Sequence, residues 1–118
     1  MIRPLFPRIV SMSVAAALAL TSATALSAAP KDGQAQKALV DAMDTEYLQT
    51  RFDKAEKKLR DAIDVCGASG CTPALKAKLY VALATVLAGG MKQLEDAREA
   101  FVEALKLDKN AKPDPDLT

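Results

Sequence analysis

The residues with the clearest chemical potential are two cysteines in the middle of the chain. They occur in the segment Cys66-Gly-Ala-Ser-Gly-Cys71, across a glycine-rich turn. In an oxidising compartment, we expect cysteines this close to form a structural disulfide between Cys66 and Cys71. The alternatives are free thiols or a redox-active pair, although the redox motif has two intervening residues rather than four. A zinc site is not expected, because it needs about four ligands and the chain has two cysteines and no histidine.

No other polar group stands in a pattern that supports catalysis. Histidine, the commonest general base, is absent. Carboxylates such as Asp41, Asp44 and Glu46 fall among lysines on expected solvent faces, which do not form the shaped, partly dry cleft that acid–base work needs. The formal net charge is +1 without a basic stripe, so nucleic acid is not an expected partner. We therefore expect no enzymatic activity, no cofactor and no bound metal.

The N-terminal stretch has the composition of an export signal. Arg3 and Arg8 precede a mostly apolar run over residues 9–20. Two tripeptides of small residues follow and suit cleavage, Ala23-Thr24-Ala25 and Ser27-Ala28-Ala29. The alternative is an uncleaved membrane anchor, but serines and threonines interrupt the run before it reaches the roughly 20 apolar residues that a span needs. We expect an exported protein, periplasmic or secreted, without a membrane span after cleavage.

The rest of the chain favours helices, because alanine and leucine supply most of its apolar mass. The expected organisation is a signal peptide over 1–29, a flexible lead over 30–33, a helical domain over 34–108 and a loose C-terminal tail over 109–118. The domain should contain two hairpins, 34–66 and 73–107, whose four helices run roughly over 34–49, 52–66, 73–88 and 92–107.

Several residues mark the ends of these helices and the sides that they bury. Thr72 can cap the third helix, and Pro73 suits its first position. Gly67 and the Gly89-Gly90 pair suit helix ends. The third helix is apolar on most of its circumference, which predicts that it lies between neighbours. In the fourth helix, we expect five side chains to face inward: Leu94, Ala97, Phe101, Ala104 and Leu105.

One pattern occurs in the second helix of both hairpins. Ala55-x3-Leu59-x2-Ala62-Ile63 is repeated as Ala97-x3-Phe101-x2-Ala104-Leu105. Residues of the second hairpin also stand at the positions of the tetratricopeptide W-x2-L-G-x2-Y motif and of its Leu-Asp-Pro end: Tyr80, Leu83, Ala84, Leu87 and Leu107-Asp108-Lys109. The chain therefore resembles the tetratricopeptide repeat family, of the secreted type found in Gram-negative bacteria. Its repeat spacing of 42 residues, against about 34 in the family, is a departure.

The resemblance implies an all-α fold in which antiparallel hairpins stack as a short superhelix. A plain four-helix bundle is the alternative. In this family the first helix of each hairpin lines a concave groove that binds another protein or a peptide. The residues of this chain that the resemblance places there are Lys37, Val40, Tyr47, Lys78, Val81 and Thr85. It therefore implies an adaptor or scaffold module of the bacterial cell envelope, whose partner the sequence does not identify.

A structural, self-associating envelope protein is the alternative function. Two hairpins are fewer than the roughly three repeats that such arrays usually need for stability. The third helix, apolar nearly all round, could then complete its burial against another copy of the chain. A homo-oligomer is therefore a second expected partner state.

Overall fold

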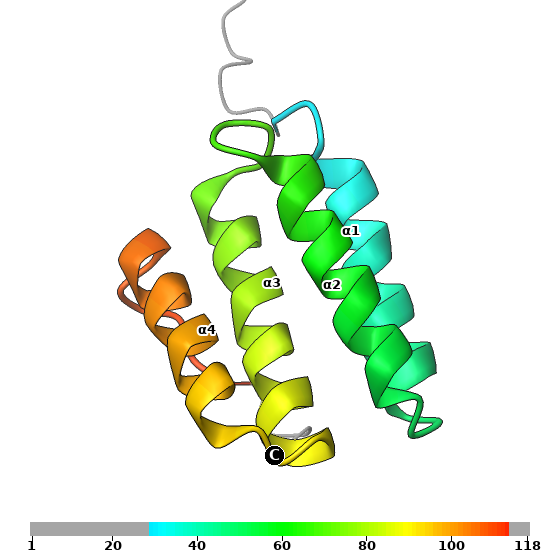
Figure 1. Cartoon of the computed structure of the whole chain (residues 1–118). Helices are drawn as coiled ribbons and strands as arrows, with labels where there is room; N and C mark the ends of the chain where they lie inside the picture. The colour runs from blue at the N-terminus through cyan, green and yellow to red at the C-terminus, as the bar shows by residue number, and fades with distance from the viewer. Residues whose placement is uncertain (1–28, 114–118) are drawn as a thin grey trace, which may run out of the picture.

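The computed structural model describes residues 29–113, which fold as an all-α domain with four α-helices and no strands in that range (Figure 1). The elements are α1 (Asp32–Val40) with a π-helical extension η2 (Asp41–Tyr47), α2 (Phe52–Cys66), α3 (Pro73–Thr85) with a π-helical extension η3 (Val86–Gly90), and α4 (Leu94–Leu107). The predicted all-α class is confirmed. The signal peptide predicted over 1–29 lies outside the described residues except for Ala29, and residues 114–118 of the tail lie outside them too.

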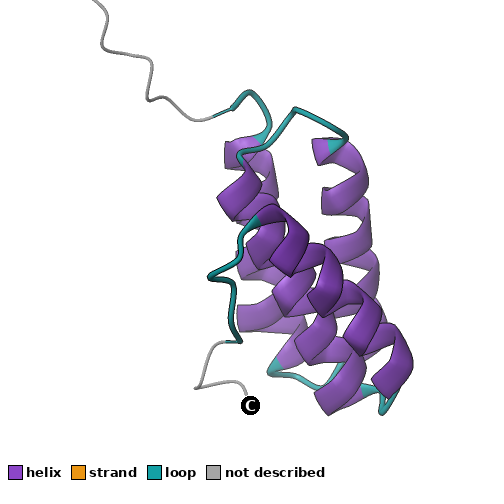
Figure 2. Cartoon of the chain, turned by 90° about the vertical axis from the view of Figure 1, so that its left-hand side faces the viewer, coloured by secondary structure: helices purple, strands orange, loops and turns teal. Residues whose placement is uncertain are grey.

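The four α-helices form two antiparallel hairpins, α1 with α2 and α3 with α4 (Figures 1 and 2). The start of α3 agrees with the sequence signal, since the Thr72 hydroxyl accepts a hydrogen bond from the Leu75 N–H at 3.4 Å and Pro73 follows it. Gly67 ends α2 with φ +56°, a backbone angle that glycine adopts at little cost. α1 begins at Asp32, earlier than the predicted residue 34, so part of the expected flexible lead is helical.

Helix α3 forms the centre of the domain and lies against α1, α2 and α4. Its buried residues come from every side of the helix: Leu75, Ala77, Leu79, Val81, Ala82, Leu83, Ala84 and Thr85. This confirms the predicted position between neighbours. Full burial of one such side chain, Leu79 for example, contributes about 1.5–3 kcal/mol. Because one chain already covers α3, a second copy is not needed to complete its burial.

Small residues let the helices approach closely. The alanines of the repeated pattern are buried in both hairpins, Ala55 and Ala62 on α2, and Ala97 and Ala104 on α4. The larger residue between them differs, since Leu59 is fully buried whereas the other hairpin has a half-buried Phe101. The two hairpins therefore use the same spacing but do not reach the same degree of burial.

The predicted inward face of α4 was wrong at both ends. Leu94 is 66% exposed and Leu105 is 39% exposed. The reason is that α4 packs mainly against α3 and η3, and it turns its alanines toward them, including the unpredicted Ala100. Leu94 and Leu105 lie to the side of this narrow contact, where no further helix of the described chain covers them.

The Gly89-Gly90 pair at the end of η3 has a packing role that the sequence did not indicate. A Cβ atom at position 90 would lie 2.5 Å from the Phe52 ring, and one at position 89 would lie 2.9 Å from the Tyr47 hydroxyl. The two rings pack edge to face with centroids 5.4 Å apart. Because the two glycines have no side chains, the turn of the first hairpin packs directly against the backbone at the end of η3 in the second hairpin.

Candidate partner groove

A groove of about 460 Å³ lies between the first helices of the two hairpins. Its walls come from α1 and η2 on one side, from α3 on the other, and from the segment 108–112 that follows α4. Leu39, Met43, Ala77, Val81 and Ala82 supply apolar surface to this lining. The remaining lining residues are Gln36, Val40, Asp44, Ala74, Lys78, Thr85, Asp108, Asn110, Ala111 and Lys112.

The structure brings four of the six sequence-predicted groove residues together in this lining: Val40, Lys78, Val81 and Thr85. Val40 is 43% exposed and Lys78 is exposed, whereas Val81 and Thr85 are buried. The Thr85 hydroxyl donates to the Val81 carbonyl at 3.0 Å, within the same helix. Val40 and Lys78 are thus the two that an incoming ligand can reach most directly.

The other two predicted residues are not part of the lining. Lys37 is exposed on α1, outside the set of residues that form the groove. Tyr47 is half-buried and packs with Phe52 and against Gly89, at the contact between the hairpins. Its ring therefore holds the two hairpins together instead of facing the groove.

Sequence reasoning missed most of the first wall and all of the third. Helical spacing could have found the first wall, because Gln36, Leu39, Val40 and Met43 recur at intervals of three and four residues. Segment 108–112 gives no such signal, since it is not helical.

The segment after α4, expected to be loose, packs against α3. The Asp108 carboxylate accepts from the Asn110 N–H at 2.9 Å, and the Asp108 carbonyl accepts from the Ala111 N–H at 2.9 Å. These two bonds turn the chain back, so that Ala111 packs against the buried cluster of Ala77, Val81 and Ala104. The segment thereby becomes the third wall of the groove.

The groove carries charges that have no partner within the described part of the chain. Asp44, Lys78 and Lys112 are exposed, and within residues 29–113 none of them forms an ion pair or side-chain hydrogen bond. A groove with apolar walls and unpaired charges of both signs can bury apolar side chains and also orient a polar chain.

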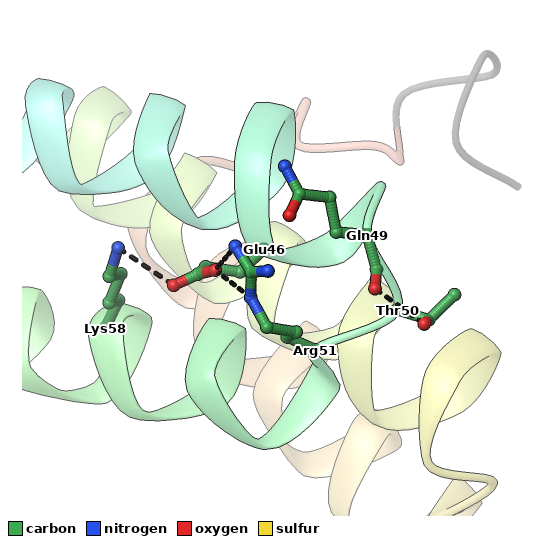
Figure 3. Close-up of polar contacts among 5 residues, drawn as sticks. All are labelled: Glu46, Gln49, Thr50, Arg51 and Lys58. Carbon is green, nitrogen blue, oxygen red and sulfur yellow. Dashed lines mark hydrogen bonds and ion pairs between the residues drawn. The ribbon is translucent and has the colours of Figure 1, made fainter.

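A buried carboxylate on η2 fixes the turn between α1 and α2 (Figure 3). Glu46 Oε1 accepts from Arg51 Nε at 2.7 Å and lies 2.6 Å from Arg51 Nη2, while its Oε2 lies 3.1 Å from Lys58 Nζ. Hydrogen bonds from Arg51 and Lys58 lower the pKa of Glu46 below its ordinary value of 4.5, and the bond from Arg51 has the larger effect. Glu46 is bound on both oxygens, so its role is to join η2 to α2 and hold the first wall of the groove.

The opposite end of the domain is fixed around the disulfide that joins Cys66 to Cys71, which confirms the predicted pairing. The Gly70 N–H donates to the Cys66 carbonyl at 2.7 Å, and the Gly70 carbonyl accepts from the Lys31 N–H at 2.7 Å. Asp32 accepts from the Ala29 N–H at 3.1 Å and from the Thr72 N–H at 2.8 Å. The start of α1 is therefore bonded directly to the loop that begins α3, and the two groove helices are aligned at this end.

Comparison with protein-family models, curated proteins and solved structures gives no match to this chain. Within residues 29–113, no cluster of three or more potential ligands is arranged to hold a metal ion. Across the same residues, every helix is too short or too polar to cross a bilayer.

Proposed function

We propose that this chain is a non-enzymatic interaction module of the bacterial cell envelope, which binds a peptide segment of another protein in the groove between α1 and α3. The single observation that carries the proposal is the groove itself, with its apolar walls and its unpaired exposed charges. Stacked helical hairpins that leave such a groove use it to bind an extended or helical segment of a partner. On this proposal the chain is tetratricopeptide-like, exported by its N-terminal signal and periplasmic or secreted.

The groove suits a peptide better than a flat protein surface. Its volume of about 460 Å³ lies in the range of specific ligand pockets. Asp44 on one wall and Lys78 and Lys112 on the others offer charges of opposite sign to a peptide backbone or its side chains. The Glu46 network and the Asp32 bonds hold α1 at both ends, so the walls need little rearrangement when a ligand enters.

Photo-crosslinking in the native envelope tests this proposal. A photoreactive residue in place of Lys78 should give one dominant adduct with another protein, whereas the same residue in place of Lys57, exposed on α2 outside the groove, should not. Val40→Glu should abolish the adduct, because it places a charge on the apolar part of the lining.

Val65→Glu is the matched control for Val40→Glu. Val65 lies on α2 outside the groove and is 38% exposed, against 43% for Val40, so both changes add one carboxylate to a partly exposed valine. Equal crosslinking from positions 78 and 57, or an adduct that survives Val40→Glu, would show that the groove is not the binding site.

A further inference from the structure

The outer side of α4 carries an apolar stripe that the described chain leaves uncovered. Leu94 is 66% exposed, Val102 is 42% and Leu105 is 39%. These are three of the six exposed large hydrophobic residues in the described part of the chain, on one helix of 14 residues. None of them lines the groove, so the stripe is a separate surface.

The other copy of the repeated sequence pattern, on α2, is buried at the corresponding positions. Ile63 on α2 holds the position that Leu105 holds on α4, and Ile63 is partly buried against the core cluster. Phe52, which precedes Ala55 as Leu94 precedes Ala97, is likewise packed against Gly90. The same molecule therefore buries these two positions in one copy of the pattern and leaves them exposed in the other.

The arrangement of charges along α4 selects the orientation of a covering helix. With 3.6 residues per turn, positions eleven apart share one stripe, so Leu94 and Leu105 lie together and Glu95 and Lys106 lie together beside them. In an antiparallel pair of identical α4 helices, Leu94 meets Leu105 of the other copy, and Glu95 meets Lys106 of the other copy. Two-fold symmetry makes each of these contacts twice. In a parallel pair, Glu95 and Lys106 of the other copy would lie at different heights along the helices and would not meet.

We propose that α4 is a dimerisation helix, whose apolar stripe docks on the α4 of a second copy in an antiparallel, two-fold symmetric pair. Arg98, near the centre of the stripe, lies 3.9 Å from Glu95 in an exposed pair that stabilises little. Its aliphatic stem extends the apolar stripe, and its guanidinium can stack on Phe101 of the other copy.

The proposed contact is small and therefore reversible. A helix of 14 residues is about 21 Å long, so one helix pair buries an area at the low end of specific interfaces. We expect a monomer–dimer equilibrium that depends on concentration. The groove stays open in the dimer, since no residue of α4 lines it, and failure of the dimer would leave the proposed groove function intact.

Sedimentation equilibrium of the purified, processed chain over a range of concentrations tests the proposal. The wild-type chain should dimerise, and Leu105→Glu should weaken the dimer at least about tenfold, which is a loss of about 1.4 kcal/mol. Val65→Glu is the control, because Val65 is 38% exposed against 39% for Leu105 but lies on α2. A circular dichroism melt of each variant verifies that it is folded. A wild-type monomer at every concentration, or equal weakening by both variants, overturns the proposal.

Charge reversal tests the orientation separately. Lys106→Glu should weaken the dimer, and adding Glu95→Lys should restore it, because the pair is then exchanged across the interface. Lys106 also pairs with Glu103 of its own helix at 2.9 Å, and Glu95 with Arg98. The double variant repairs neither of these internal pairs, so restored association does not come from a contact within one copy. No restoration in the double variant overturns the antiparallel arrangement.

Discussion

Replacing Gly90 by alanine should destabilise the domain, although glycine to alanine in a helical segment is usually favourable. The backbone of Gly90 does not have the positive φ that would demand glycine. The obstacle is the Phe52 ring, whose Cδ1, Cγ and Cε1 atoms would lie 2.5, 2.6 and 2.9 Å from the new methyl group. Either the ring or the η3 backbone must move, and Phe52 is also held by its packing against Tyr47.

The expected magnitude follows from two opposing terms. Overpacking a close contact lowers the free energy of unfolding by about 1–3 kcal/mol. The helical preference for alanine over glycine raises it by about 0.5–1 kcal/mol. The middle values of the two ranges give a net loss of about 1.3 kcal/mol in the free energy of unfolding. In a Phe52→Ala background the methyl group meets no ring, so Gly90→Ala should become neutral or slightly stabilising. The coupling energy of this double-mutant cycle should be about 1–3 kcal/mol.

Urea unfolding followed by circular dichroism at the helix band measures all four members of the cycle. Gly33→Ala is the control, because a Cβ atom there meets nothing within 4 Å and α1 should gain stability from it. If the two substitutions Gly90→Ala and Phe52→Ala prove additive, the reasoning is refuted. A Gly90→Ala variant as stable as the wild type would refute it equally.

Two further predictions concern the ends of the domain. Reducing the disulfide, or replacing Cys66 and Cys71 by serine, should lower stability by about 2 kcal/mol, measured by thermal melting with and without reductant; an unchanged melting temperature would contradict this. Because the pKa of Glu46 is lowered in the fold, its ion pairs contribute to stability above pH 4.5. This contribution is lost as the pH falls through the lower pKa of the folded state. Glu46→Gln should therefore flatten the acid limb of a stability–pH curve. Asp61→Asn is the control at neutral pH, where it should change stability little because it removes only an exposed pair with Lys57.

The helices could be predicted from the sequence because their signals are local. The α2 range is the same in prediction and structure, and Thr72 and Pro73 mark the start of α3 as expected. The burial of α3 followed from its composition alone, since a helix that is apolar on most of its circumference must be covered on most of it. The pairing of Cys66 with Cys71 followed from their short separation.

The remaining features depend on what surrounds each residue. Leu94 and Leu105 fit an inward pattern, but burial also requires a neighbour, and α4 has none on that side among the described residues. Tyr47 fits the groove by position, yet Phe52 and the Gly89-Gly90 backbone hold its ring elsewhere. The contact of Ala111 with α3 comes from a turn at Asp108 and has no periodic signal.

The central position of α3 has a consequence for how the domain opens. In long repeat arrays each unit touches only its neighbours, so that segments can unravel independently from either end. Within the described residues, α3 contacts α1, α2 and α4. Separating the two hairpins therefore exposes apolar surface of α3 to water. We infer that the two hairpins melt as one cooperative unit, with the slowest amide hydrogen exchange in α3. An engineer who wished to graft or delete one hairpin would have to supply a new cover for that helix.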